Sequence, residues 1–130
     1  VQAPPFEREG PMVMESQREA ANQQGRRTVT QFLSAHRDRG TIMMSMGSLG
    51  HYMQDLSADG FEIRDFLHEG NGDLWVYAMR DPAPLAPWVV MEERSEGGDA
   101  VAREARRRPD FLRAYTRVAE GGGVALYRRR

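Results

Sequence analysis

The chain contains no cysteine, which excludes disulfide bonds and metal sites with thiolate ligands. Lysine is absent as well, so all 18 basic residues are arginine, and 19 acidic residues bring the net charge to −1. General nucleic-acid binding normally needs a basic protein, so we expect no nucleic-acid partner. Long apolar runs are also missing, since none approaches the about 20 residues that a membrane-spanning helix needs.

What is present is typical of an ordinary globular domain: hydrophobic residues make up 40% and charged residues 28% of the 130 positions. Residues 1–14 carry three prolines and show no hydrophobic period, so we predict an extended lead-in there. Residues 15–130 are predicted to form a single α/β domain. The chain starts at Val1 instead of methionine, which favours a processed chain or a piece of a longer protein.

Helical and strand patterns alternate along the chain, which predicts an α/β fold. Predicted strands cover residues 41–46, 61–67, 88–92, 115–120 and 124–128. Predicted helices cover residues 15–39, 73–80 and 100–108. A further predicted helix lies between the first two, with Ser48 as its N-cap and Gly60 at its end. We expect a mostly parallel sheet, its first three strands parallel, with helices on both faces and a C-terminal antiparallel β-hairpin turning at the GGG tripeptide. The predicted core consists of Phe32, Leu33, Ile42, Met44, Leu49, Met53, Leu56, Val90 and Leu126.

Three polar loops follow the first three predicted strands: GSLGH, HEGNGD and EERSEGGD. Loops that follow parallel strands share one edge of a sheet, where ligands usually bind. Free amides at a helix N-terminus would favour an anion, and imidazole with carboxylate suits a divalent ion. The candidate ligand-binding residues are Gly47, Ser48, His51, His68, Glu69, Asn71, Glu92 and Glu93.

The motifs that would fix a reaction are missing from these loops. Neither the GxGxxG fingerprint nor the GxxxxGK[ST] loop is present, and no HxH or HExxH spacing supports a metal site. The nucleophile elbow GxSxG is absent too. We therefore predict no catalytic residue, no metal-ligand set and no cofactor, and the favoured interpretation of GSLGH is a strand-to-helix turn with Ser48 as cap.

Four stretches carry a resemblance to a known family: MMSMGSLGHYMQDLSADGF, FLHEGNGDLW, WVVMEERSEGGD and YTRVAEGGGVALYRR. Residues 15–129 resemble the soluble C-terminal region of bacterial polytopic membrane proteins of the dolichyl-phosphate-mannose mannosyltransferase-like (GT-C) type. In that family the catalytic acids lie in loops of the membrane-embedded part, so the resemblance carries no catalytic residue over to this chain.

The resemblance implies an accessory domain on the extracytoplasmic side of a bacterial plasma membrane. Such a domain would be non-catalytic alone and would pack against the membrane-embedded part of the same polypeptide. It would aid the binding of an acceptor or of a polyprenyl-phosphate sugar, and the parent protein would be a glycosyltransferase.

The alternative is a free-standing α/β enzyme or ligand-binding protein that uses the histidine and carboxylate residues of the loop edge. Apolar segments of about 20 residues upstream of Val1 would favour the membrane-protein interpretation over this one. Arginines gather in the C-terminal third, from Arg103 to Arg108 and again at the end of the chain. Such a run suits acidic lipid head groups or an ordinary solvated helix face.

Overall fold

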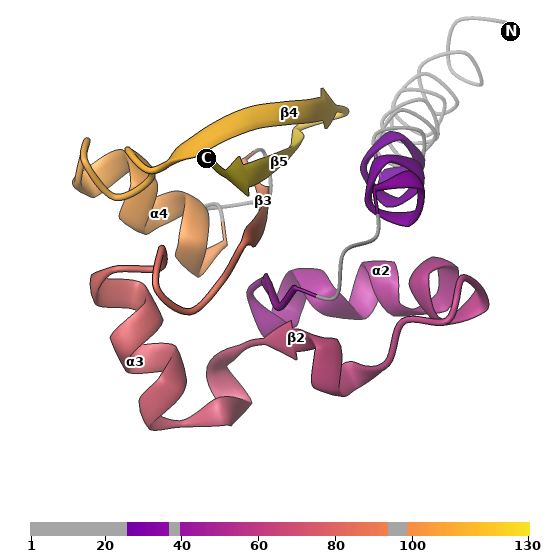
Figure 1. Ribbon diagram of the computed structural model, residues 1–130, viewed down its shortest axis with the longest axis horizontal. Helices are drawn as coiled ribbons and strands as arrows, with labels where there is room; N and C mark the ends of the chain where they lie inside the picture. The colour runs from indigo at the N-terminus through magenta and orange to yellow at the C-terminus, as the bar shows by residue number, and fades with distance from the viewer. Residues whose placement is uncertain (1–25, 37–39, 94–98) are drawn as a thin grey trace, which may run out of the picture.

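The computed structural model describes residues 26–36, 40–93 and 99–130, without the side chains of residues 50–55. A helix over residues 26–35 comes first, and Figure 1 shows the elements that follow. These are β1 (Ile42–Met43), α2 (Met46–Ala58), β2 (Phe66–Leu67), α3 (Asp73–Arg80), β3 (Trp88–Glu92), α4 (Ala100–Arg107), β4 (Tyr115–Gly121) and β5 (Val124–Arg129). Two 3-10 turns, Ile63–Asp65 and Glu69–Asn71, flank β2.

The five strands form one mixed sheet in the order β2-β1-β3-β5-β4. Strand β1 pairs in parallel with β2 and β3, whereas β5 pairs antiparallel with β3 and β4. The predicted α/β class, the parallel arrangement of the first three strands and the C-terminal hairpin are therefore confirmed. Gly122 and Gly123 turn the hairpin with positive φ angles of 59° and 83°, a conformation that other residues rarely adopt.

Buried side chains of the strands alternate between two core clusters. Successive residues of a strand point to opposite faces, so Ile42 and Val90 enter the first cluster and Met43 and Val89 the second. The first cluster also contains residues of the first helix and α2, and the second contains residues of α3 and α4. The predicted core residues that are buried are Leu33, Ile42, Met44, Leu49, Leu56, Val90 and Leu126. Phe32 is only partly buried, and the side chain of Met53 lies outside the described part.

Two of the predicted strands are wrong in length. The first pairs only over Ile42–Met43, because α2 begins already at Met46, with Ser45 as its N-cap. Ser48 is therefore inside the helix and does not cap it. The second pairs only over Phe66–Leu67, because the segment before it folds as a 3-10 turn closed by a hydrogen bond from the Glu62 amide to Asp65 Oδ2, at 2.7 Å.

The later elements agree more closely with the sequence patterns. Helix α3 has the predicted bounds, α4 ends one residue early, and β4 and β5 each extend one residue further. Of the predicted helix 15–39, residues 26–35 are helical and His36 forms a turn. The other residues of that prediction lie outside the described residues, and so does the predicted lead-in 1–14. No helix in the described part is both long and apolar enough to cross a membrane.

Leu56 gives a test of the first cluster, because its side chain in α2 is completely buried. Replacing it with alanine should lower the free energy of unfolding by about 2–5 kcal/mol in urea melts, since the cavity cannot fully close. Ile63→Ala is the control: Ile63 is 51% exposed, and its loss should cost less than about 0.5 kcal/mol. A loss for Leu56→Ala as small as that of the control would contradict the packing of α2 on the sheet.

Candidate functional site

Side-chain hydrogen bonds join the described segments that follow β1, β2 and β3, and Glu69 makes the first connection. Its Oε1 accepts a hydrogen bond from the Met46 amide at 2.6 Å, and its Oε2 accepts one from the Ser45 hydroxyl at 2.8 Å. Glu69 thus provides the cap for the α2 N-terminus that the Ser45 side chain does not give. A carboxylate of the chain occupies the place that an external anion would take at the Met46 amide.

Asp99 makes the second connection, and its carboxylate accepts three hydrogen bonds. Oδ1 accepts from the Ala102 amide at 2.7 Å and so caps α4. Oδ2 accepts from the Ser48 hydroxyl at 2.9 Å and from the Glu92 amide at 2.8 Å. Asp99 and Ser48 are only 8% and 3% exposed, so this junction of α2, β3 and α4 is closed to solvent.

His68 organises the 3-10 turn after β2. The His68 amide donates to Asn71 Oδ1 at 2.8 Å, and the ring Nδ1 accepts from the Gly70 amide at 3.0 Å. An accepting Nδ1 places the proton of the neutral ring on Nε2. The turn is tight, because a Cβ added at Gly70 would lie 2.8 Å from His68 Cε1. His68 and Asn71 therefore shape the loop that delivers Glu69 to α2.

The other predicted site residues have different surroundings. Gly47 lies in the first turn of α2, and an added Cβ would meet nothing within 4 Å, so no close approach requires glycine there. His51 belongs to α2, but its side chain lies outside the described part. Glu93 Oε1 and Oε2 accept hydrogen bonds from Arg117 at 2.9 and 3.2 Å. Glu92 contributes its backbone amide to the Asp99 junction.

Hydrogen bonding governs the electrostatics of this edge. Partial burial opposes ionisation of Glu69, but the hydrogen bonds from the Met46 amide and the Ser45 hydroxyl outweigh it and lower the pKa of the carboxyl below its ordinary value. For Arg117, burial alone would lower the pKa, but the hydrogen bonds of its guanidinium to Glu93 and Tyr127 outweigh burial and raise the pKa. Both groups are therefore charged at neutral pH.

Sequence reasoning placed Asp99 at this edge as a helix cap but missed its contact with Ser48, and it missed Ser45 as a member of the edge. Asp99 has a local signal, because an aspartate just before a helical pattern predicts an N-cap, but its bond to Ser48 spans 51 positions. Ser45 has no local signal for its bond to Glu69. Within the described ranges, no group of three or more His, Asp or Glu side chains could hold a metal ion. These hydrogen bonds join the loops to each other, and they occupy the carboxylate oxygens of Glu69 and Asp99 that a ligand could otherwise contact.

The Asp99 junction predicts energetic coupling between distant positions. Asp99→Ala should destabilise the chain by about 2–3 kcal/mol in urea melts, because it removes a helix cap and leaves buried donors without an acceptor. Combined with Ser48→Ala, the loss should fall short of the sum by about 1 kcal/mol. The control is Ser34→Ala, whose hydroxyl donates instead to Asp59, and it should add to Asp99→Ala within about 0.5 kcal/mol. Full additivity of Ser48→Ala and Asp99→Ala would contradict the junction.

The Glu69 cap predicts a pH-dependent contribution to stability. A lowered carboxyl pKa stabilises the fold above the pKa of the unfolded chain, and this contribution disappears as the pH falls through the folded pKa. Glu69→Gln should therefore cost about 0.5–1 kcal/mol at pH 7, the lower part of the range for a cap because Glu69 is exposed. The two proteins should become equally stable in acid, below the ordinary value of 4.5. Glu120→Gln, which alters an exposed ion pair with Arg117, should show no such convergence.

Comparisons with models of known protein families, with curated protein sequences and with solved structures returned no match.

Proposed function

We propose that this chain is a non-catalytic accessory domain that acts by contact with a partner. One observation carries the proposal: three carboxylates of the loop edge hydrogen-bond to the chain itself. Glu69 binds the α2 N-terminus, Asp99 binds three donors, and Glu93 binds Arg117. A catalytic centre would need groups at this edge that are free to take up a proton or a substrate.

The wider context is an extracytoplasmic domain of a membrane glycosyltransferase-like protein. The support for it is the resemblance of residues 15–129, which implies contact with a membrane-embedded part of the same polypeptide and help in binding an acceptor or a polyprenyl-phosphate sugar. Within this proposal, helices cover both faces of the sheet. Its support is that each core cluster combines strand residues with residues of two helices.

The proposal is tested by assaying the 130-residue chain for release or transfer of sugar from a short-chain polyprenyl-phosphate sugar. We expect no turnover with or without Mn²⁺, and no change on replacing His68 with alanine. Turnover that His68→Ala reduces would contradict the proposal and favour the free-standing enzyme.

The membrane context has its own test in the full reading frame, which should encode upstream apolar segments of about 20 residues. A frame without such segments would contradict the membrane context and would leave the non-catalytic role to be judged by the assay alone.

A further inference from the structure

Helices α3 and α4 enclose a groove that lies away from the loop edge. Figure 1 shows the two helices next to each other on the same side of β3. The groove has a volume of about 340 Å³. The residues that line it are Trp75, Val76, Met79, Arg80, Glu104, Arg107 and Arg108.

One wall of this α3–α4 groove is apolar and continues onto the surface of α3. Trp75 is 8% exposed and packs in the second core cluster, with Met79 partly buried against the same cluster. Val76 is 47% exposed, and on the same helix Leu74 and Tyr77 are about half exposed. Trp75, Val76 and Met79 thus form an apolar patch along one side of the groove, of the kind that marks a binding surface.

The opposite wall is built by arginines, and Arg108 fixes its geometry. The Arg108 guanidinium donates to the backbone carbonyls of Met79 and Arg80, the latter at 2.9 Å, and so caps the α3 C-terminus. Its Nε lies 2.7 Å from Glu104 Oε1, and its guanidinium carbon lies 5.0 Å from the centre of the Phe111 ring. Arg108 is thus committed to joining α4 to α3 and is not free for a ligand.

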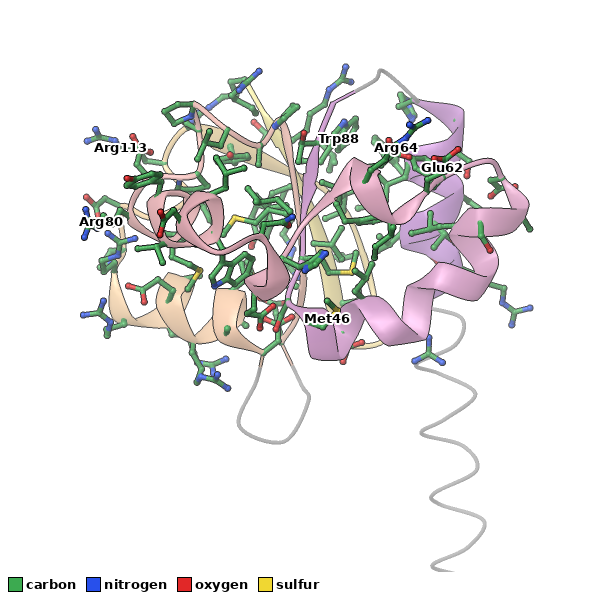
Figure 2. The ribbon with its side chains drawn as sticks, turned by 90° about the horizontal axis from the view of Figure 1, so that it is seen from below. Met46, Glu62, Arg64, Arg80, Trp88 and Arg113 are labelled. Carbon is green, nitrogen blue, oxygen red and sulfur yellow. The ribbon has the colours of Figure 1, made fainter. Side chains whose placement is uncertain are left out.

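The remaining arginines leave the groove positively charged. Arg107 shares the Glu104 carboxylate with Arg108, and its own side chain is 71% exposed. The Arg80 guanidinium is exposed and has no hydrogen-bond or ion-pair partner among the described residues. Three arginines and one glutamate therefore line the groove, in a chain whose overall charge is −1. Figure 2 shows Arg80 at the side of the molecule opposite Arg64 and Glu62.

We propose that the α3–α4 groove binds a single-chain anionic amphiphile, a molecule with one apolar chain and a phosphate head group. The chain lies on Trp75, Val76 and Met79, and Arg80 and Arg107 bind the phosphate, which guanidinium groups can hold with two parallel hydrogen bonds. This inference rests on the groove and would stand without the proposed function.

The size and the lining of the groove suit this occupant. Its volume is at the low end of the range for small-molecule sites. A single alkyl chain with its head group at the arginine wall uses both the apolar area and the charge.

The test is a titration of the ¹⁵N-labelled 130-residue chain with dodecyl phosphate below its micelle concentration. Shifts should concentrate at residues 75–80 and 104–108, and dodecyl maltoside, which is neutral, and inorganic phosphate should each bind at least about fivefold more weakly. Arg80→Gln should weaken dodecyl phosphate binding roughly five- to tenfold, the loss of one charge-assisted interaction. Because the Arg80 side chain has no partner in the described fold, this variant should fold normally.

Two substitutions provide matched controls. Arg64→Gln removes an arginine whose side chain is 79% exposed and pairs with Glu62 outside the groove, and it should leave affinity unchanged. Val76→Ser should weaken binding by the apolar chain, whereas Ile63→Ser, at a similarly exposed position, should not.

Equal binding of the neutral and anionic amphiphiles would overturn the proposal, as would equal losses in Arg80→Gln and Arg64→Gln. Binding to vesicles of anionic phospholipid without binding of monomeric dodecyl phosphate would also overturn it, and would assign the patch to a bilayer surface. Shifts with inorganic phosphate alone, as strong as those with dodecyl phosphate, would reduce the groove to a simple anion site and contradict the role of the apolar wall.

Discussion

The carboxylate of Asp99 is the point on which the arrangement of the elements depends most. It receives hydrogen bonds from the end of β3, from α2 and from the first turn of α4. Helix α2 contributes to one core cluster and α4 to the other, with β3 between them contributing to both. A nearly buried carboxylate is costly to desolvate unless donors surround it, and here those donors are groups that would themselves lack partners. One residue therefore sets the relative positions of three elements.

Local signals in the sequence account for the parts of the fold that were predicted well. Asp73 begins one helical pattern and Asp99 precedes another, Trp88 begins an unbroken apolar run, and the glycines after Glu120 require a turn. The lengths of β1 and β2 were not predictable in this way. An apolar run shows that residues are buried, but it does not show how many of them pair with a neighbouring strand, and Met44 is buried without belonging to β1.

The candidate site shows the same limit at the level of single side chains. Parallel strands deliver their loops to one edge, so the meeting of the loops followed from the order of elements. Which acceptor binds which donor did not follow. The Ser45–Glu69 and Ser48–Asp99 pairs join residues 24 and 51 positions apart, and neither pair belongs to a short motif. The α3–α4 groove was hidden for a similar reason, since Arg80 and Arg107 become neighbours only after both helices pack on the sheet.

Strand β4, the first strand of the C-terminal hairpin, forms one margin of the described sheet, where its only partner strand is β5. Its pairing is interrupted by a bulge between Arg117 and Ala119, and Arg117 and Glu120 form an ion pair along it. An open strand margin normally invites a second chain to add its own strand, the first step of fibre growth. The bulge bends the row of free backbone groups, and a docking strand would have to accommodate both charges. Among the described strands, β4 is thus an unfavourable edge for the addition of a strand from a second chain.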